Sequence, residues 1–197
     1  MVRTSPLDKL TDTIFGFALA VGALGLTVRN LQDPSEIIAG LFIFGLSFVI
    51  LIVIWWGHHD VMTHIDTGKP KTILLNVVLL FFVAIEPYLL NTLNADVALF
   101  SFTSTLYAID MAFLMGISAF LAHIVIAENQ GKLSDAQLSS YRLSRNSQAV
   151  FAGLFLLSVF PQFLTWRFLN MPVRVCLWFA TLALSIITSA KKRKNSD

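Results

Sequence analysis

Charged residues are scarce in this 197-residue chain: only 13% are Asp, Glu, Lys or Arg, whereas 56% are hydrophobic. Soluble domains carry about 25% charged residues, so the chain lacks the polar surface that a globular protein presents to water. The single cysteine, Cys176, excludes a disulfide framework and a cysteine-based zinc site. The net charge of only +2 argues against a nucleic-acid partner. The composition therefore predicts an integral membrane protein, which we interpret as one domain over residues 1–197.

Long apolar runs are abundant. A membrane-spanning helix needs about 20 mostly apolar residues, and six runs approach or exceed that length: Leu10–Val28, Ile37–Trp56, Ile73–Leu93, Leu99–Ala127, Ala149–Phe168 and Val173–Ala190. We therefore expect an all-α six-helix bundle. Pro161 is expected to kink the fifth helix, and the polar tract Glu128–Gln148 is expected to form the longest connection, as a continuation of helix and a turn.

The basic residues are distributed unevenly between the two ends of this bundle. Eleven fall at one end: Arg3, Lys9, Lys69, Lys71, Lys132, Arg142, Arg145, Lys191, Lys192, Arg193 and Lys194. Three fall at the other end: Arg29, Arg167 and Arg174. Cytoplasmic loops carry the excess of Lys and Arg, so we expect a multi-pass cell-membrane protein with both termini in the cytoplasm.

The first apolar run differs from the others because small residues crowd its middle. Gly16 and Ala20, and likewise Ala18 and Gly22, have the small-xxx-small spacing that lets helices approach closely in lipid. Its large residues recur at three- or four-residue steps and form one stripe: Ile14, Phe17, Val21 and Leu24. Two interpretations stay open, a tightly packed core helix and a helix whose copies meet around an axis so that the stripe lines a pore.

Polar residues gather where the first run begins and the second ends. Asp12 follows Thr11, and a carboxylate at the start of a helix is favoured by the helix dipole. The second run ends in Trp55, Trp56, Gly57, His58, His59 and Asp60. Adjacent histidines point to different faces of a helix and chelate one metal poorly, so we expect a histidine bonded to a carboxylate; a metal site of His59, Asp60 and His64 is the alternative.

Three ionisable residues fall within or near the later runs: Glu86, Asp110 and His123. Such residues are costly in a membrane and often functional. For Asp110 a polar contact between helices and a proton or ion route are both open, whereas Glu86 and His123 could reach the membrane interface.

Four motifs in order resemble the transmembrane protein 175 family of potassium channels. The segment Leu10–Leu19 is similar to the Phe-Ser-Asp signature of helix one, and Ile54–His59 to the Trp-x-x-His-His ending of helix two. Leu80–Pro87 looks like the apolar run into a proline in helix three, and Leu106–Ala108 resembles a feature of helix four. The resemblance covers the first four runs, and six runs agree with the prokaryotic single-repeat members.

The resemblance implies a potassium-permeable channel, a homotetramer in which helix one lines the central pore, with K⁺ as permeant ion and no cofactor. Phe17 matches the bulky residue that closes the family's pore, with Ile14, Val21 and Leu24 on the same stripe. Ala20 stands where the family has a selectivity threonine, which predicts weak selectivity. Pro6 stands where it has an arginine, and Leu10 and Thr11 replace the signature phenylalanine and serine. A cytoplasmic clamp joining helices one and two is then expected to include Thr11, Asp12, Trp55, Trp56, His58 and His59.

Two other functions are kept as alternatives. A proton-coupled cation transporter would use Glu86, Asp110 and His123 as a relay and would show saturable flux. A membrane metalloenzyme would hold a metal at the His58–His64 segment. The sequence contains no nucleotide-binding loop, nucleophile elbow or Cys-His pair, so we expect a protein that is not an enzyme.

Overall fold

The computed structural model describes residues 6–25, 34–93, 99–168 and 171–194. Within these ranges the chain is almost entirely helical, which confirms the predicted all-α class. The elements are α1 (Pro6–Leu24), α2 (Pro34–Met62), α3 (Pro70–Thr92), α4 (Phe100–Glu128), α5 (Asp135–Ser158), α6 (Pro161–Thr165), β1 (Arg167–Phe168), β2 (Met171–Pro172) and α7 (Val173–Lys194). The end of the first predicted run and the basic residues Arg3 and Arg29 lie outside the described residues.

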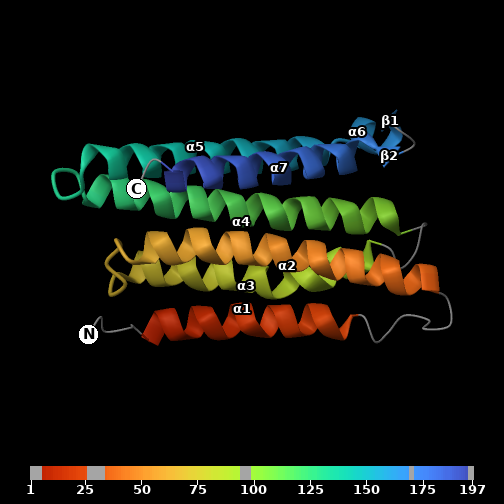
Figure 1. Ribbon diagram of the computed structural model, residues 1–197, viewed down its shortest axis with the longest axis horizontal. Coiled ribbons are helices and arrows are strands. Elements are labelled where there is room, and N and C mark those ends of the chain that lie inside the picture. The colour runs from red at the N-terminus through yellow and green to blue at the C-terminus, as the bar shows by residue number, and fades with distance from the viewer. Residues whose placement is uncertain (1–5, 26–33, 94–98, 169–170, 195–197) are drawn as a thin grey trace.

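The six long helices run side by side in antiparallel succession (Figure 1). Helix α1 lies at one edge and packs on α3 and α2, α4 packs on α3 and α5, and α5 packs on α7. Helices α1, α3 and α5 begin, and α2, α4 and α7 end, at the same end of the bundle (Figure 1). We call this end the basic end, because Lys9, Lys69, Lys71 and Lys132 lie there.

Three of these helices are long and apolar enough to cross a membrane. They are the Gly40–Met62 part of α2, together with α3 and α4, and only the described residues enter this comparison. Helix α1 carries Asp8, Lys9 and Asp12 in its first two turns, and α5 begins in the polar tract. Charged and polar residues at the start of these two helices therefore lower their mean hydropathy, although their remaining turns are apolar.

The fifth predicted run is not one helix. Helix α5 ends at Ser158, and Pro161 occupies the first turn of the short α6 rather than kinking a continuous helix. The residue before a proline avoids the helical region, and Phe160 accordingly has φ −59° and ψ 135°. The antiparallel pair β1–β2 then reverses the chain into α7. The predicted span Ala149–Phe168 was therefore wrong beyond Ser158.

The other end of α5 also differs from its predicted start. The helix begins at Asp135, where Ser134 and Gln137 form a capping box in which each side chain bonds the other residue's backbone N–H. The tract Glu128–Gln148 is thus a helix end, a tight turn with Gly131 at φ 81°, and two turns or more of a new helix. Its polarity reflects a helix that continues beyond the apolar layer.

Candidate functional site

The two faces of α1 differ sharply in burial. Thr11, Phe15 and Ala18 are buried against the rest of the protomer. A second, exposed face carries Leu10, Phe17 and Leu24, with Phe17 and Leu24 each 62% exposed. Positions seven residues apart lie on one side of a helix, so these three side chains form one apolar row, which we call the free face.

The small residues of α1 divide between these two faces. A Cβ added at Gly22 would lie 3.4 Å from Pro87 of α3, and Ala18 is fully buried, so this pair makes the close α1–α3 contact. A Cβ added at Gly16 would meet nothing within 4 Å, and Ala20 is exposed. One small-xxx-small pair is therefore used inside the protomer, and the other lies on its outside.

The structure places the predicted pore residues around the free face. Phe17, Ala20 and Leu24 are exposed, whereas Ile14 and Val21 are half-buried at its border, and Ile14 packs on the core. The three- and four-residue periodicity does not distinguish exposed from half-buried positions, because Ile14 and Phe17 both fit the same stripe. Burial separates them.

Asp12 contacts the end of α2. The indole Nε1 of Trp55 donates a hydrogen bond of 2.9 Å to Asp12 Oδ1, and the ring of Trp55 stacks on His59 with centroids 5.8 Å apart. Because α1 begins at Pro6, Asp12 lies in the second turn, and the acid in the first turn is Asp8. The predicted helix-dipole role fits Asp8 rather than Asp12, since that effect fades beyond the first turn.

A second, buried chain of hydrogen bonds joins α1, α3 and α2. Asn76 Nδ2 donates to Thr11 Oγ1 at 3.3 Å, and Asn76 Oδ1 lies 2.6 Å from Nε2 of His58. An amide oxygen only accepts, so His58 carries its proton on Nε2. Sequence reasoning missed Asn76, although an amide within the apolar run Ile73–Leu93 was the available signal.

The six residues of the predicted clamp thus divide into two contacts. Asp12, Trp55 and His59 meet on the surface, and Thr11 and His58 meet through Asn76 inside. Trp56 is exposed on the other side of α2.

The residues of the possible metal site have different partners. His58 faces Asn76, and His59 stacks on Trp55. Asp60 Oδ1 and His64 Nδ1 lie 3.2 and 3.0 Å from the hydroxyl of Tyr141 in α5. Burial, helped by Asp60, raises the pKa of the Tyr141 phenol above its ordinary value, so it remains a hydrogen-bond donor. Among the described residues, no group of three or more His, Cys, Asp or Glu side chains is placed to hold a metal ion.

Arg174, at the start of α7, fastens the opposite end of the bundle. Its guanidinium donates to the carbonyl oxygens of Ser158 and Val159 at 2.7 and 2.9 Å, and to Ser104 Oγ at 2.7 Å. The arginine is almost fully buried. It therefore satisfies backbone acceptors at the end of α5 while joining that helix to α4 and α7.

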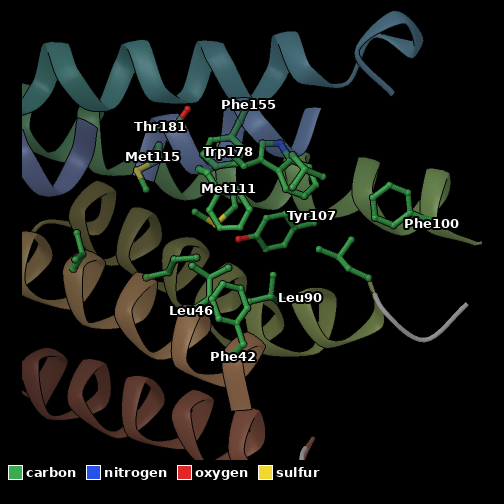
Figure 2. A pocket seen from close by; sticks show the side chains of 15 residues that line it. Phe42, Leu46, Leu90, Phe100, Tyr107, Met111, Met115, Phe155, Trp178 and Thr181 are labelled. Carbon is green, nitrogen blue, oxygen red and sulfur yellow. The ribbon is translucent and has the colours of Figure 1, made fainter. Parts of the chain in front are cut away.

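A cavity of about 260 Å³ lies between the α2–α3 and α4–α7 parts of the protomer (Figure 2). Tyr107 and Thr181 are its polar lining residues; the others are apolar or aromatic: Phe42, Leu46, Ile50, Val53, Leu90, Leu93, Phe100, Met111, Met115, Phe155, Val175, Trp178 and Phe179. Such a lining offers an ion few ligands, so the cavity is better suited to apolar groups than to ions.

Comparison with known proteins identifies the fold. Residues 7–87, which cover α1, α2 and most of α3, match the family model described as endosomal/lysosomal potassium channel TMEM175. A crystal structure of a variant of the potassium channel MtTMEM175, in complex with a nanobody–MBP fusion protein, aligns with 98% of this chain and 95% of its own at a TM-score of 0.67 and 16% identity. No curated protein matches the chain. The predicted resemblance is therefore confirmed: residues 7–87 of this membrane protein match the TMEM175 potassium-channel family model, and 98% of the chain shares the fold of a TMEM175 channel.

Proposed function

We propose that the chain is the subunit of a potassium-permeable, weakly selective cation channel of the cell membrane, with K⁺ as its permeant ion. In this proposal four copies assemble so that their α1 helices surround the conduction axis. Support comes from the family match over α1–α3, from the fold shared with a potassium channel, and from the position of α1 at the edge of the protomer.

The free face of α1 is the observation that carries the proposal. Phe15, Ala18 and Gly22 anchor the buried face of α1. The helix therefore cannot turn Phe17 inward without breaking its packing on α3. Phe17 and Leu24 therefore remain outside the protomer. Copies of this face brought together around an axis would form rings of Leu10, Phe17 and Leu24.

Such rings would gate by dewetting. A narrow apolar constriction holds no water, and an ion entering it sheds its hydration shell without gaining ligands. Opening then requires α1 to tilt or rotate so that the Phe17 ring widens. Ala20, which also lies exposed on α1, has no hydroxyl to offer an ion, and weak selectivity follows from this.

The basic end supports the proposed orientation. Lys9, Lys69, Lys71, Lys132 and the Arg142–Arg145 segment lie at the end where α1 begins and α7 ends, while Arg167 and Arg174 lie at the other. Cytoplasmic loops carry the excess of Lys and Arg. We therefore propose a multi-pass subunit with both termini in the cytoplasm.

Recordings from purified protein in planar bilayers under a potassium–sodium gradient test the proposal. Phe17→Ala should raise conductance or leak, and Phe17→Asn should keep the pore wet and open. Phe102→Ala is the matched control, since Phe102 is 64% exposed on α4 rather than α1. If both Phe17 variants conduct like the Phe102→Ala control and the wild type, Phe17 is not the gate. If the wild type shows no unitary currents, the protein is not a channel.

A proton-coupled transporter is the second candidate, because Glu86 and Asp110 are buried on neighbouring helices. His123, the third member of the expected relay, is exposed on α4 about 20 Å along the helix from Asp110. A contiguous relay of all three is therefore not supported. Saturable flux that depends on a pH gradient would favour the transporter, whereas unitary steps favour the channel.

A further inference from the structure

Two carboxyl groups lie inside the protomer, away from the free face of α1. Glu86 of α3 is fully buried, and Asp110 of α4 is 3% exposed. Ser47 of α2 donates a hydrogen bond of 2.8 Å to Glu86 Oε2. Glu86 Oε1 and both carboxyl oxygens of Asp110 have no hydrogen-bond partner among the described residues.

Among the described residues, the side chain bonded to this pair is the neutral Ser47. The groups that act on them electrostatically are each other and the phenol of Tyr107, which lies one turn before Asp110 on α4. Within the described chain, no Lys, Arg or His side chain forms a salt bridge with either carboxyl group. Arg174, the buried cation of the bundle, bonds Ser104, Ser158 and Val159 instead.

Two ionised carboxylates cannot remain in this environment without compensation. A buried charge without a partner costs far more than a hydrogen bond returns, and like charges on neighbouring helices raise that cost. Buried acceptors without donors add about 1–3 kcal/mol each. Some positive species must therefore join the pair, and it must fit among Ser47, Tyr107 and apolar neighbours.

A proton fits these limits better than a metal ion. Hard cations such as Ca²⁺ and Mg²⁺ take six or more oxygen ligands, and here the hydroxyl of Ser47 points its hydrogen at Glu86 as a hydrogen-bond donor. A proton needs one carboxylate oxygen, and it turns an unpartnered acceptor into an O–H donor. We propose that Ser47, Glu86 and Asp110 form a proton-binding site inside each protomer, separate from the conduction axis.

The chemistry is one acid–base step. A proton from water binds an oxygen of Asp110 or Glu86, the carboxylate becomes a carboxylic acid, and one negative charge is removed from the pair. The new O–H becomes a hydrogen-bond donor inside the bundle, where Ser47 of α2 already bonds Glu86 of α3. Proton occupancy at this site thus strengthens the contacts among the three helices that are apolar enough to cross a membrane.

Infrared spectroscopy of the full-length protein in lipid vesicles tests this directly, and it does not depend on conduction. The wild type should show the carbonyl stretch of protonated carboxylic acids at neutral pH, with a downshift in D₂O. The double variant Asp110→Asn/Glu86→Gln should abolish this band while preserving side-chain shape, and each single change should shift it, because the remaining acid can still hold the proton. Glu128→Gln is the control, because Glu128 forms a salt bridge with Lys69 near the surface, outside the buried pair.

Ser47→Ala gives a second readout that keeps both acids. Loss of its hydroxyl should shift the acid band without reducing its area, because one oxygen of Glu86 loses its donor. A wild-type spectrum without an acid band at neutral pH would overturn the proposal. So would a band that appears only when K⁺ and Na⁺ are replaced by a large organic cation, since a metal ion would then be the occupant.

Discussion

The indole of Trp55 donates a hydrogen bond to Asp12, 43 residues earlier in the chain, at 2.9 Å. This bond fixes the rotation of α1 relative to α2 at the basic end, one and a half turns before Phe17. The stacking of Trp55 on His59 in turn holds the indole. The direction in which Phe17 points therefore depends on a contact at the end of α2 as well as on the packing of Phe15 and Ala18.

Loss of the Asp12–Trp55 bond should impair assembly more than conduction. Asp12→Ala and Trp55→Phe should each destabilise the protomer by about 1 kcal/mol, since the pair is exposed. Asp12→Asn should be milder, because its amide oxygen still accepts from the indole. The fraction of protein that elutes as the oligomer measures this, with Trp166→Phe as control. Normal oligomer from Asp12→Ala would contradict the clamp.

Asn76→Ala should destabilise the protein more than the position of Asn76 in an apolar run implies. The change leaves Thr11 and His58 buried without a partner from α3, and each such group costs about 1–3 kcal/mol. We expect a loss of several degrees or more in the melting temperature of the purified protein. Val77→Ala, the neighbouring exposed position, should change little. Equal melting temperatures for the two variants would show that the buried chain adds no stability.

Arg174→Met should destabilise the bundle by about 3 kcal/mol or more, because the carbonyl oxygens of Ser158 and Val159 lose their donors inside the protein. Arg174→Lys should recover only part of this, since an ammonium group cannot reproduce the guanidinium fork. Chemical unfolding in detergent measures both, with the exposed Arg142→Met as control. Wild-type stability of Arg174→Lys would mean that a positive charge alone, without the guanidinium fork, is enough to stabilise this end of the bundle.

The length of the apolar runs predicts most of the helices. The helix ends and contacts that it does not predict are determined by polar side chains. The runs place α2, α3, α4 and α7 to within a few residues at most ends, because lipid requires each span to be apolar and internally bonded. They fail at α5, where the capping box starts the helix in polar sequence and Pro161 ends its apolar part. Asn76 and the pairing of Glu86 with Ser47 depend on how the helices rotate, which periodicity in a uniformly apolar helix does not specify.

A substitution at Gly16 tests the assembly of the protomers independently of their folding. A side chain at Gly16 meets nothing within 4 Å in the protomer, and a helical glycine costs up to about 1 kcal/mol relative to alanine. Gly16→Leu should therefore fold normally, yet it should disrupt the oligomer if copies of α1 approach closely on this face. Gly153→Leu is the matched control, since Gly153 is exposed on α5 and is also open to a new side chain.

Mass measurement of the detergent-solubilised protein distinguishes the outcomes. Gly16→Leu should yield monomers or lose unitary current while its melting temperature stays at the wild-type value, and Gly153→Leu should remain oligomeric. The reverse result, an intact conducting oligomer from Gly16→Leu, would place the conduction axis away from α1. Gly25→Ala gives the opposite case, because its Cβ would lie 2.8 Å from Asn91 Nδ2 inside the protomer. That variant should lose stability, since the new methyl group would force the Asn91 side chain to move.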